Sequence, residues 1–436
     1  MAFASVPLTA LDDFIMRGAD QRNAQLHVGV LLTVPGRPPT PAVLRDYVGG
    51  RVERVPALGY RLDDDRSCWR PDSGFDPGSH VDAHRVEPGA DLPMAALDLP
   101  SLDPGRPQWS LTVLHGYSPN EYTLCYRAHH MFQDGLSIAH AVEALFGRRR
   151  MPAPVPPSAA DFHVSRVAAP STPLVGALPR SLTDWGLPMR RTANWTPNKQ
   201  PGTGRFIVHA VDLDTARLAA TALAVRASVN QVCLAALSGA LRQWTPHDWQ
   251  DPLDRRNRRG LGVILPLNLR PATQVNALGN WVGLLPITLP CHEPSAMRRL
   301  HHVLGEIHPA RTLRHRLRGQ KAIRHLPHVL TRRLAVRCTD PAYLATAITT
   351  IRISTGLTVV GAPVGSLRFV PPIGKQHRLI AAILQHGSMA TATLIADAAL
   401  LRDPLTDPAR LGGLWQEAIA ELHTLTTMVE TTTRRP

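Results

Sequence analysis

The chain has few cysteines, few lysines and few aromatic residues for its length. Its five cysteines lie far apart and form no CxxC pair, so the sequence predicts neither a disulfide framework nor a cysteine-ligated zinc site. No run of about 18 apolar residues occurs, and the first 14 residues have no basic region followed by an apolar one. We therefore expect a cytoplasmic protein with reduced thiols that is at most peripheral to a membrane.

Positive charge is abundant, with a formal net charge of +14, but only three of the 48 basic residues are lysines. Clustered cations attract the phosphates of nucleic acids and of lipids. An arginine-rich, proline-rich composition is also typical of a GC-rich genome, which would produce basicity without any such partner. No basic motif interleaved with aromatic residues occurs, so we expect no nucleic-acid partner.

A length of 436 residues with 44% hydrophobic content predicts two or three globular units. From Arg148 the chain reads RRRMPAPVPPS, where alternating prolines end any helix and favour extended backbone. We therefore predict an N-terminal half over residues 1–150, a crossover linker over 151–204 and a C-terminal half over 205–436.

Both halves show alternating helix and strand patterns and no internal repeat. In the second half we predict helices from Val211 to Ala224 and from Val229 to Trp244, with buried strands over 261–267 and 282–290. This alternation is typical of an α/β fold with two layers in each half.

The most informative segment is His129-His130-Met131-Phe132-Gln133-Asp134-Gly135. Alternating apolar residues on either side of a turn-forming stretch, 116–121, predict a hairpin whose second strand ends at His129. After Gly135 the apolar spacing changes to that of a helix. The segment is therefore expected on a turn between a strand and a helix.

A histidine at such a turn suits acyl transfer. Attack on a thioester requires removal of a proton from the acceptor O–H or N–H, and neutral imidazole does this near neutral pH. His130 is the candidate base. Two other interpretations stay open. The two histidines could form a solvated or hydrogen-bonded pair without a catalytic role. They could also bind a metal ion, although the sequence nearby has no His-x3-His helix and no cysteine partner.

The neighbours of His130 have supporting roles in this interpretation. Asp134 would either orient the imidazole or hold the loop through an arginine pair, and we favour the second. Gly135 leaves room for close backbone approach and for an unusual φ, and Ser137 would support the start of the helix.

HHxxxDG is shared by acyltransferases of the chloramphenicol acetyltransferase-like fold, including peptide-synthetase condensation domains. The surrounding sequence resembles the bacterial wax ester synthase/diacylglycerol acyltransferase family more specifically. The similar stretches follow in the family's order: PLTALDDFIMRGAD from Pro7, WRPDSGFDPGSHV from Trp69, LDPGRPQWSLTVLHGY from Leu102, VNQVCLAALSGALR from Val229, and ILPLNLRP with LGNWVGLLPITLP between Ile264 and Pro290.

This resemblance implies two chloramphenicol acetyltransferase-like domains in a pseudo-dimer, with mixed sheets flanked by helices and an active-site channel at the interface. It implies direct transfer without a covalent acyl-enzyme, with His129, His130, Asp134 and Gly135 at the catalytic motif. The implied donor is acyl-CoA or a carrier-protein phosphopantetheine thioester, with no permanently bound cofactor and no metal.

Two departures from the family pattern concern the substrate. Asn230-Gln231 replaces the usual Asn-Asp, and ISTGLTVVG from Ile353 to Gly361 replaces an SNVPGP-like segment. We interpret the chain as a diverged member that acylates a specialised metabolite, or a glycosyl or polyketide-type alcohol, rather than one that makes storage lipid.

Three further polar residues, Asn268, Arg270 and Asn280, fall in the matched segments. They are expected to shape the substrate channel or an oxyanion contact, with turn and strand-end capping as the alternative. The segment from Arg311 to Arg337 has nine cations and no acid, with leucines at helical spacing. It would bind anionic lipid, an acidic carrier protein or coenzyme A phosphates, or simply form a solvated helix face.

The sequence thus predicts an acyl-CoA-dependent O-acyltransferase. An amide-forming, condensation-like enzyme acting with a carrier protein is the main alternative. A condensation-like recruitment module without catalysis is the third.

Overall fold

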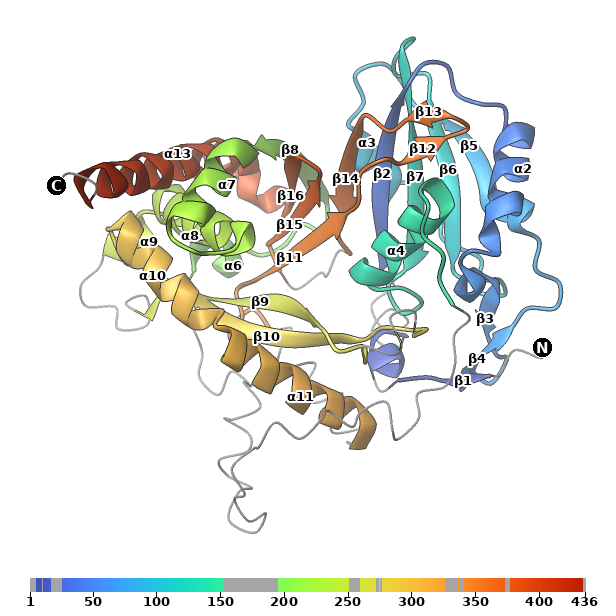
Figure 1. The fold of residues 1–436 in the computed structure, drawn as a ribbon, viewed down its shortest axis with the longest axis horizontal. Coiled ribbons are helices and arrows are strands. Elements are labelled where there is room, and N and C mark those ends of the chain that lie inside the picture. The colour runs from blue at the N-terminus through green and yellow to red at the C-terminus, as the bar shows by residue number, and fades with distance from the viewer. Residues whose placement is uncertain are drawn as a thin grey trace.

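The computed structural model (Figure 1) describes residues 5–9, 11–16, 26–152, 195–250, 259–271, 274, 277–325, 336, 340–372 and 377–433. Residues 153–194, which make up most of the predicted crossover linker, lie outside the described residues, as do Cys338 and most of the basic segment beyond residue 325.

A mixed five-stranded sheet forms the N-terminal half, in the order β14-β2-β7-β6-β5. Only β5 and β6 are parallel, and the other pairs are antiparallel. A second, three-stranded sheet has the order β1-β4-β3. The bounds of these strands are β1 (Val6–Pro7), β2 (His27–Pro35), β3 (Tyr60–Leu62), β4 (Cys68–Pro71), β5 (Val81–Arg85), β6 (Trp109–His115), β7 (Glu121–His129) and β14 (Ser366–Val370).

The predicted hairpin is confirmed, because β6 and β7 pair antiparallel and β7 ends at His129. The predicted helix after it is α4 (Gly135–Phe146), which is buried along nearly its whole length. The other helical elements of this half are α2 (Pro41–Val52), η1 (Pro56–Gly59), η2 (Pro77–His80) and α3 (Leu92–Leu97).

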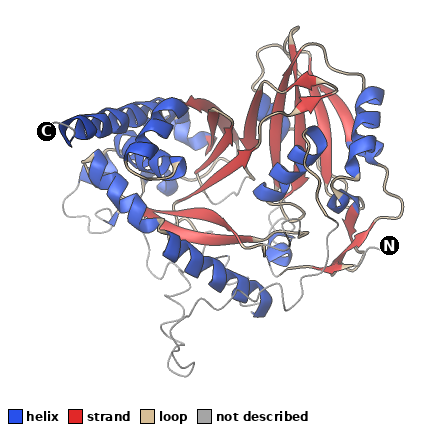
Figure 2. Ribbon diagram, viewed as in Figure 1, coloured by secondary structure: helices blue, strands red, loops and turns tan. Residues whose placement is uncertain are grey.

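A six-stranded mixed sheet in the order β10-β9-β11-β15-β16-β8 forms the C-terminal half. Its strands are β8 (Phe206–Leu213), β9 (Leu261–Asn268), β10 (Val282–Leu289), β11 (Thr346–Ile353), β15 (Leu379–His386) and β16 (Met389–Asp397). Figure 2 shows helices gathered on one side of this sheet. They comprise α6 (Thr196–Lys199), α7 (Thr215–Ala224), α8 (Val229–Trp244), α9 (His247–Gln250), α10 (Ala296–Glu306), α11 (Pro309–His325), η6 (Ala398–Arg402), η7 (Pro404–Thr406) and α13 (Pro408–Thr433).

The predicted helix from Val211 begins too early. Residues up to Leu213 belong to β8, which pairs antiparallel with β16, and α7 begins only at Thr215. Asp214 caps α7 by accepting the N–H of Arg217, and its carboxylate marks the boundary that apolar spacing missed. The predicted helix at 229–244 and the strands near 261–267 and 282–290 are confirmed.

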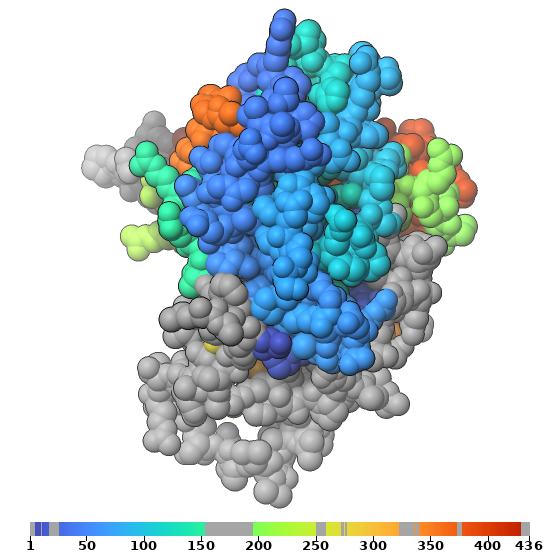
Figure 3. All heavy atoms as spheres, turned by 90° about the vertical axis from the view of Figure 1, so that its right-hand side faces the viewer, coloured from blue at the N-terminus to red at the C-terminus, as the bar shows by residue number. Residues whose placement is uncertain are grey.

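One segment from the C-terminal part of the sequence packs into the N-terminal half. After β11, residues 358–370 cross to the N-terminal half, where β14 extends the five-stranded sheet beside β2. The small hairpin of β12 (Thr358–Val359) and β13 (Ala362–Pro363) lies against the same half, and Tyr47 donates its hydroxyl hydrogen to the Thr358 carbonyl at 2.8 Å. Figure 3 shows this orange hairpin beside the blue N-terminal surface.

Two large apolar cores result, one for each half, and a smaller cluster lies between them. The N-terminal core includes Ile351, Leu367 and Phe369 from the C-terminal part of the sequence. The predicted α/β class with mixed sheets and flanking helices is therefore confirmed. In the described part of the chain no single helix is long and apolar enough to cross a membrane; α7 and α8 pass that test only as a pair bent by 108°.

Candidate functional site

His130 follows directly after the last residue of β7. Its backbone N–H donates to the Leu26 carbonyl at 2.7 Å, which fixes the chain as it leaves the sheet. Asp134 then caps α4 by accepting the Ser137 N–H at 3.0 Å. The motif therefore forms a short turn that is held by the sheet at one end and by a helix cap at the other.

His130 is half-buried, and two polar groups lie near its Nδ1 atom. The Gln133 carbonyl is 3.3 Å away and the Asn280 Nδ2 is 3.4 Å away. The tautomer decides the role of Nδ1: with the proton on Nδ1 the ring donates to the Gln133 carbonyl, which can only accept, and the Nε2 lone pair is free, whereas without it Nδ1 accepts from the Asn280 amide. Burial lowers the pKa of His130 below its ordinary value, against smaller opposing effects of Gln133 and Asp134. The ring is thus neutral and basic near pH 7.

Asp134 forms a fully buried ion pair with Arg270, which lies 136 residues later in the sequence. The Nη1–Oδ2 distance is 2.6 Å and each side chain is 1% exposed. Burial alone would raise the pKa of Asp134, but Arg270 and the N–H groups of Ser137 and Trp281 outweigh it, so the pKa lies below its usual value. Asp134 is therefore held by an arginine, as favoured from the sequence, and this arrangement replaces direct orientation of the imidazole.

Arg270 uses the rest of its guanidinium on the same turn. It donates to the Ser137 hydroxyl at 2.6 Å, to the Gly279 carbonyl at 3.0 Å and to the Ala277 carbonyl at 3.3 Å. The carboxylate of Asp134 compensates the charge of the buried guanidinium, and the three neutral acceptors satisfy its remaining N–H groups.

Asn268, Arg270 and Asn280, which were expected to shape the substrate channel or an oxyanion contact, bind protein groups at the turn. Asn268 accepts the backbone N–H of Arg270 at 2.9 Å, and Asn280 is fully buried. The Asn280 Oδ1 accepts the Val282 N–H at 3.1 Å, while Nδ2 donates to the His130 carbonyl at 2.9 Å. These bonds agree with the capping alternative, and the channel role stays a prediction.

His129 lies beside a cavity between the two halves. Its ring meets that of His27 edge-on, with 6.0 Å between centroids, and the two residues pair in register across β2 and β7. The cavity measures about 420 Å³ and is lined by residues from five elements, including His27 (β2), Leu97 (α3), Arg127 (β7), Phe206 (β8) and Val370 (β14). Neither His129 nor His130 lines this cavity, and His129 contacts its wall through the ring of His27.

The cavity combines apolar walls with one buried cation, Arg127, and with the exposed charged residues Asp98 and Arg205. Arg127 donates to the Ser110 hydroxyl and to the carbonyls of Leu99 and Pro100, all neutral acceptors. Burial lowers the pKa of Arg127, and burial together with Arg127 and His129 lowers the pKa of His27 to about 3. His27 is thus a neutral wall of the cavity at any physiological pH.

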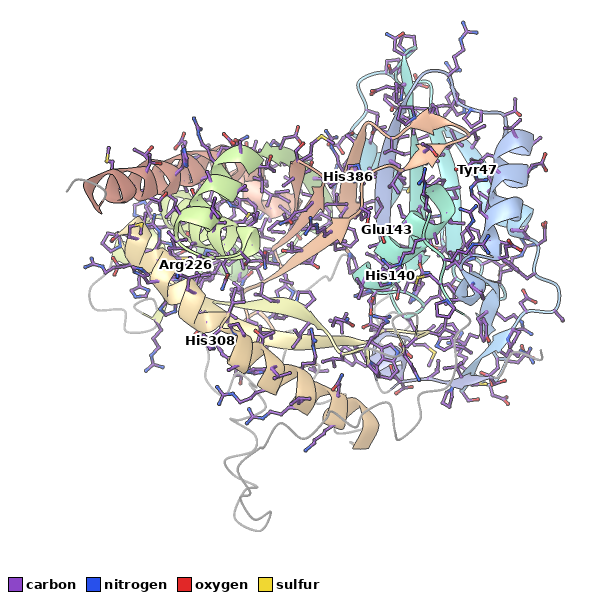
Figure 4. All side chains as sticks on the ribbon, viewed as in Figure 1. Tyr47, His140, Glu143, Arg226, His308 and His386 are labelled. Atoms are coloured by element: carbon purple, nitrogen blue, oxygen red, sulfur yellow. The ribbon has the colours of Figure 1, made fainter. Side chains whose placement is uncertain are left out.

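Gly135 contributes space rather than an unusual backbone. Its φ is not positive, so that part of the expectation is wrong. A Cβ there would lie 2.7 Å from Ile351 Cδ1 on β11, so the predicted close approach is present. At its other end α4 is tied to the residue that follows this strand, because Glu143 accepts the N–H and O–H of Ser354. Figure 4 labels His140 and Glu143 on α4, beside the orange strands of the C-terminal half.

Sequence reasoning missed three residues that complete the site. Gln133 accepts the Tyr126 hydroxyl at 2.7 Å and forms a backbone bridge with Gly279, and the Trp281 N–H donates to Asp134 at 3.0 Å. Asp12 accepts the Asn280 N–H at 2.6 Å. Asp12 and Trp281 both lie in the stretches quoted for the family resemblance, but nothing in their local sequence indicates the long-range contact.

Among the described residues no group of three or more histidine, cysteine, aspartate or glutamate side chains is placed to hold a metal ion. The chemistry available at the turn is therefore that of a neutral imidazole supported by buried carboxylates, an amide and a guanidinium.

Comparison with known proteins gives a consistent family. Residues 8–240 match the model of the wax ester synthase/diacylglycerol acyltransferase catalytic domain. A probable diacylglycerol O-acyltransferase of Mycobacterium tuberculosis is 23% identical over 469 residues, covering 98% of both chains. A putative diacylglycerol O-acyltransferase of Mycobacterium bovis is 25% identical over 342 residues, covering 68% of this chain and 66% of the relative.

Solved structures share the fold. The wax ester synthase/diacylglycerol acyltransferase from Marinobacter aquaeolei VT8 has a TM-score of 0.60 at 17% identity, covering 97% of this chain and 100% of that one. A variant of the starter condensation domain of rhizomide synthetase, in complex with C8-CoA and Leu-SNAC, has a TM-score of 0.60 at 14% identity, with 97% and 94% covered. These likenesses confirm the predicted two-domain, chloramphenicol acetyltransferase-like fold.

Proposed function

The chain belongs to the wax ester synthase/diacylglycerol acyltransferase family, and from this membership we propose that it transfers an acyl group from a coenzyme A thioester to an alcohol, with His130 as the general base. The chain is an acyltransferase of this family; the base, the donor and the acceptor class are the proposal.

The observation that carries the proposal is the state of the His130 ring. The Gln133 carbonyl lies 3.3 Å from Nδ1 and favours the tautomer with the proton on Nδ1, and burial keeps the pKa of His130 below its ordinary value. The free Nε2 lone pair is then available near neutral pH, where a general base is most effective. Asp134 and Asn280 hold the backbone on which the ring stands.

The proposed reaction proceeds without an acyl-enzyme. Nε2 of His130 accepts the proton of the acceptor hydroxyl as its oxygen bonds to the thioester carbonyl carbon. The resulting tetrahedral intermediate collapses with cleavage of the C–S bond, and the imidazolium returns its proton to the leaving thiolate. The products are an ester and a free thiol, and holding both substrates beside one base supplies much of the rate.

The interface cavity has apolar walls together with Asp98, Arg127 and Arg205, which supports a ligand that has both an apolar and a polar part. At about 420 Å³ it lies in the range of small-molecule sites. The diverged segment 353–361 leaves β11 beside α4, where Ser354 binds Glu143. This contact lies at the end of α4 opposite the His130 turn, so the interpretation that the acceptor is a specialised-metabolite alcohol rather than diacylglycerol rests on the sequence divergence of the segment.

The likeness to condensation domains favours one second candidate. The first condensation domain of the calcium-dependent antibiotic synthetase, in complex with a substrate analogue, has a TM-score of 0.61 at 17% identity and covers 98% of this chain. An amide-forming enzyme fed by a carrier protein would have the same fold, and so would a recruitment module without activity. Turnover of free acyl-CoA with an alcohol distinguishes the first proposal from both.

We also propose a peripheral contact with anionic surfaces in the cytoplasm through α11. This helix has no acidic residue, and Arg314, Arg316 and Lys321 are exposed on it. Figure 1 shows it along the lower edge of the molecule. The division into halves at residues 150 and 205 stays a prediction, since the joining segment is not described.

The test is thiol release from a panel of acyl-CoAs, with and without alcohols and amines, for the wild type and His130→Ala. We expect acceptor-dependent release that falls by about a hundredfold or more in the variant. His84→Ala, which removes an exposed histidine of β5, is the matched control and should keep wild-type rates.

Equal rates for the wild type and His130→Ala would refute the base. Release only with amines, or only from a carrier-bound thioester, would favour the condensation-like candidate. No release under any condition, with retained binding of thioesters, would favour the recruitment module.

A further inference from the structure

Asp12 is a second buried carboxylate that binds the turn beside His130. It has no exposed surface, and its Oδ1 accepts the Asn280 N–H at 2.6 Å while Oδ2 accepts the Thr9 N–H at 2.8 Å. Asp134 accepts the N–H of the next residue, Trp281, at 3.0 Å. Two carboxylates of the N-terminal half thus bind consecutive N–H groups of the C-terminal half.

Thr9 and Asp12 together hold both sides of the Asn280 peptide. The Thr9 hydroxyl donates to the Asn280 carbonyl at 3.3 Å and accepts the Asp12 N–H at 3.0 Å. The backbone of Asn280 therefore has its donor and its acceptor satisfied by two side chains that lie about 270 residues earlier in the chain.

The preceding residue must be glycine for this contact to form. Gly279 has φ +83°, and a Cβ there would lie 2.5 Å from Asp12 Oδ2. Any side chain would force the carboxylate away from the turn. The fit indicates that Asp12 and the Gly279–Asn280 peptide are matched to each other.

Asn280 passes this restraint to His130. Its Nδ2 donates to the His130 carbonyl at 2.9 Å. Its Oδ1 accepts the N–H of Val282, and this second bond fixes the orientation of the side-chain amide. Asn280 is fully buried, so no water replaces these bonds. The position of the His130 backbone therefore depends on the position of the Asn280 peptide.

We propose that Asp12 is a positioning residue for His130, acting through the Asn280 peptide and side chain. This inference rests on the proposed acyl transfer by His130. The physical reason is that a base displaced by even about 1 Å from the acceptor hydroxyl loses a large part of its rate advantage, while substrate binding in the cavity is little affected.

Burial gives Asp12 a titration near neutral pH. Desolvation raises its pKa to about 7, against the lowering effect of the Asn280 and Thr9 hydrogen bonds. The other ionisable groups around the turn are His130, Asp134 and Arg270; both His130 and Asp134 have pKa values below their ordinary ones. Ionised Asp12 binds the Asn280 N–H more strongly than the neutral acid does. The kcat of the wild type should therefore rise as the pH increases through about 7.

The experiment is a double-mutant cycle on kcat and KM with Asp12→Asn and Asn280→Ala. Both oxygens of Asp12 accept N–H groups, so an asparagine would place its own N–H against one of them. We expect kcat to fall about tenfold or more in each variant with KM within about threefold. The double variant should be no worse than the poorer single one, because both act through one path. Asp12→Asn should also lose the rise of kcat near pH 7.

Asp214→Asn is the matched control, since it removes a carboxylate cap from α7, away from the site, and should leave kcat unchanged. If Asp12→Asn does not fold, as judged by circular dichroism, Thr9→Val takes its place in the same cycle. That variant keeps the carboxylate and removes the hydroxyl bonds to Asn280 and Asp12.

If the fold-losses of kcat in the two single variants multiply in the double variant, the positioning role is overturned. An unchanged kcat in Asp12→Asn would overturn it as well. His130→Ala is measured in parallel. If it retains full activity, the proposed function fails; if it is inactive while Asp12 and Asn280 prove independent, only the present inference fails.

Discussion

Arg270 and Asp134 form a pair whose energetic weight comes from burial rather than from charge alone. Each side chain is 1% exposed, whereas the partners Arg106 and Asp103 of a surface pair are more than half exposed. Water screens the surface pair, so it contributes about 0–1 kcal/mol. Removing one partner of the buried pair leaves an uncompensated charge in the interior, which costs about 3–5 kcal/mol.

Arg270→Met should therefore lower the free energy of unfolding by about 3–5 kcal/mol, measured by chemical denaturation. Arg106→Met is the matched control and should change it by less than about 1 kcal/mol. Equal small losses in both variants would show that the buried carboxylate takes up a proton or moves to water when Arg270 is lost.

At the level of the element, α11 has two different faces. Gly319 and Gln320 face the hairpin of β9 and β10, where Gln320 donates to the Leu269 carbonyl at 3.0 Å. The other side carries exposed cations and Leu313, which is 49% exposed. A basic face with an apolar residue is typical of a helix that contacts anionic surfaces.

We expect a variant with Arg314, Arg316 and Lys321 all changed to Gln to bind vesicles of one-third anionic lipid at least tenfold more weakly than the wild type. Each cation near such a surface contributes about 1 kcal/mol. Vesicle sedimentation measures the binding, and kcat with a soluble acyl-CoA should stay unchanged.

A control with Arg37, Arg85 and Arg402 changed to Gln alters net charge by the same amount on other exposed positions. Equal loss of binding in both triple variants would show that overall charge, and not α11, governs the contact. A defect confined to carrier-bound donors would assign α11 to a carrier protein instead.

Across the whole molecule, buried histidines make stability depend on pH. In the described residues seven histidines have a pKa lowered by burial, among them His27 to about 3 and both His140 and His377 to about 4. In the unfolded chain they take up protons near pH 6.5, which the folded protein does only at lower pH. Their contribution is fully present above about pH 6.5 and is lost as the pH falls towards the folded pKa values.

The Tm should therefore fall by about 5 °C or more between pH 7 and pH 5, measured by calorimetry at constant ionic strength. Asp12, whose pKa is raised to about 7, acts in the opposite direction and only partly offsets this loss. A Tm that is constant or higher at pH 5 would contradict the burial of these rings.

The sequence by itself determined the local parts of the site. Alternating apolar residues, the turn formers at 116–121 and the change of period after Gly135 predicted the strand, turn and helix that present His130. Each of these signals acts over a few residues, because strand and helix periodicity are local properties of the chain. The resemblance of the flanking segments added the family and its fold.

Only the tertiary structure decided which distant residues meet at the turn. Arg270 reaches Asp134 across 136 positions, Asp12 reaches Asn280 across 268, and β14 joins the N-terminal sheet from the far part of the chain. No periodicity encodes these contacts, since they depend on how two sheets pack and on the space left by glycine at 279. The sequence thus determined the turn that carries the proposed base, and the packing of the two halves decided what holds that turn in place.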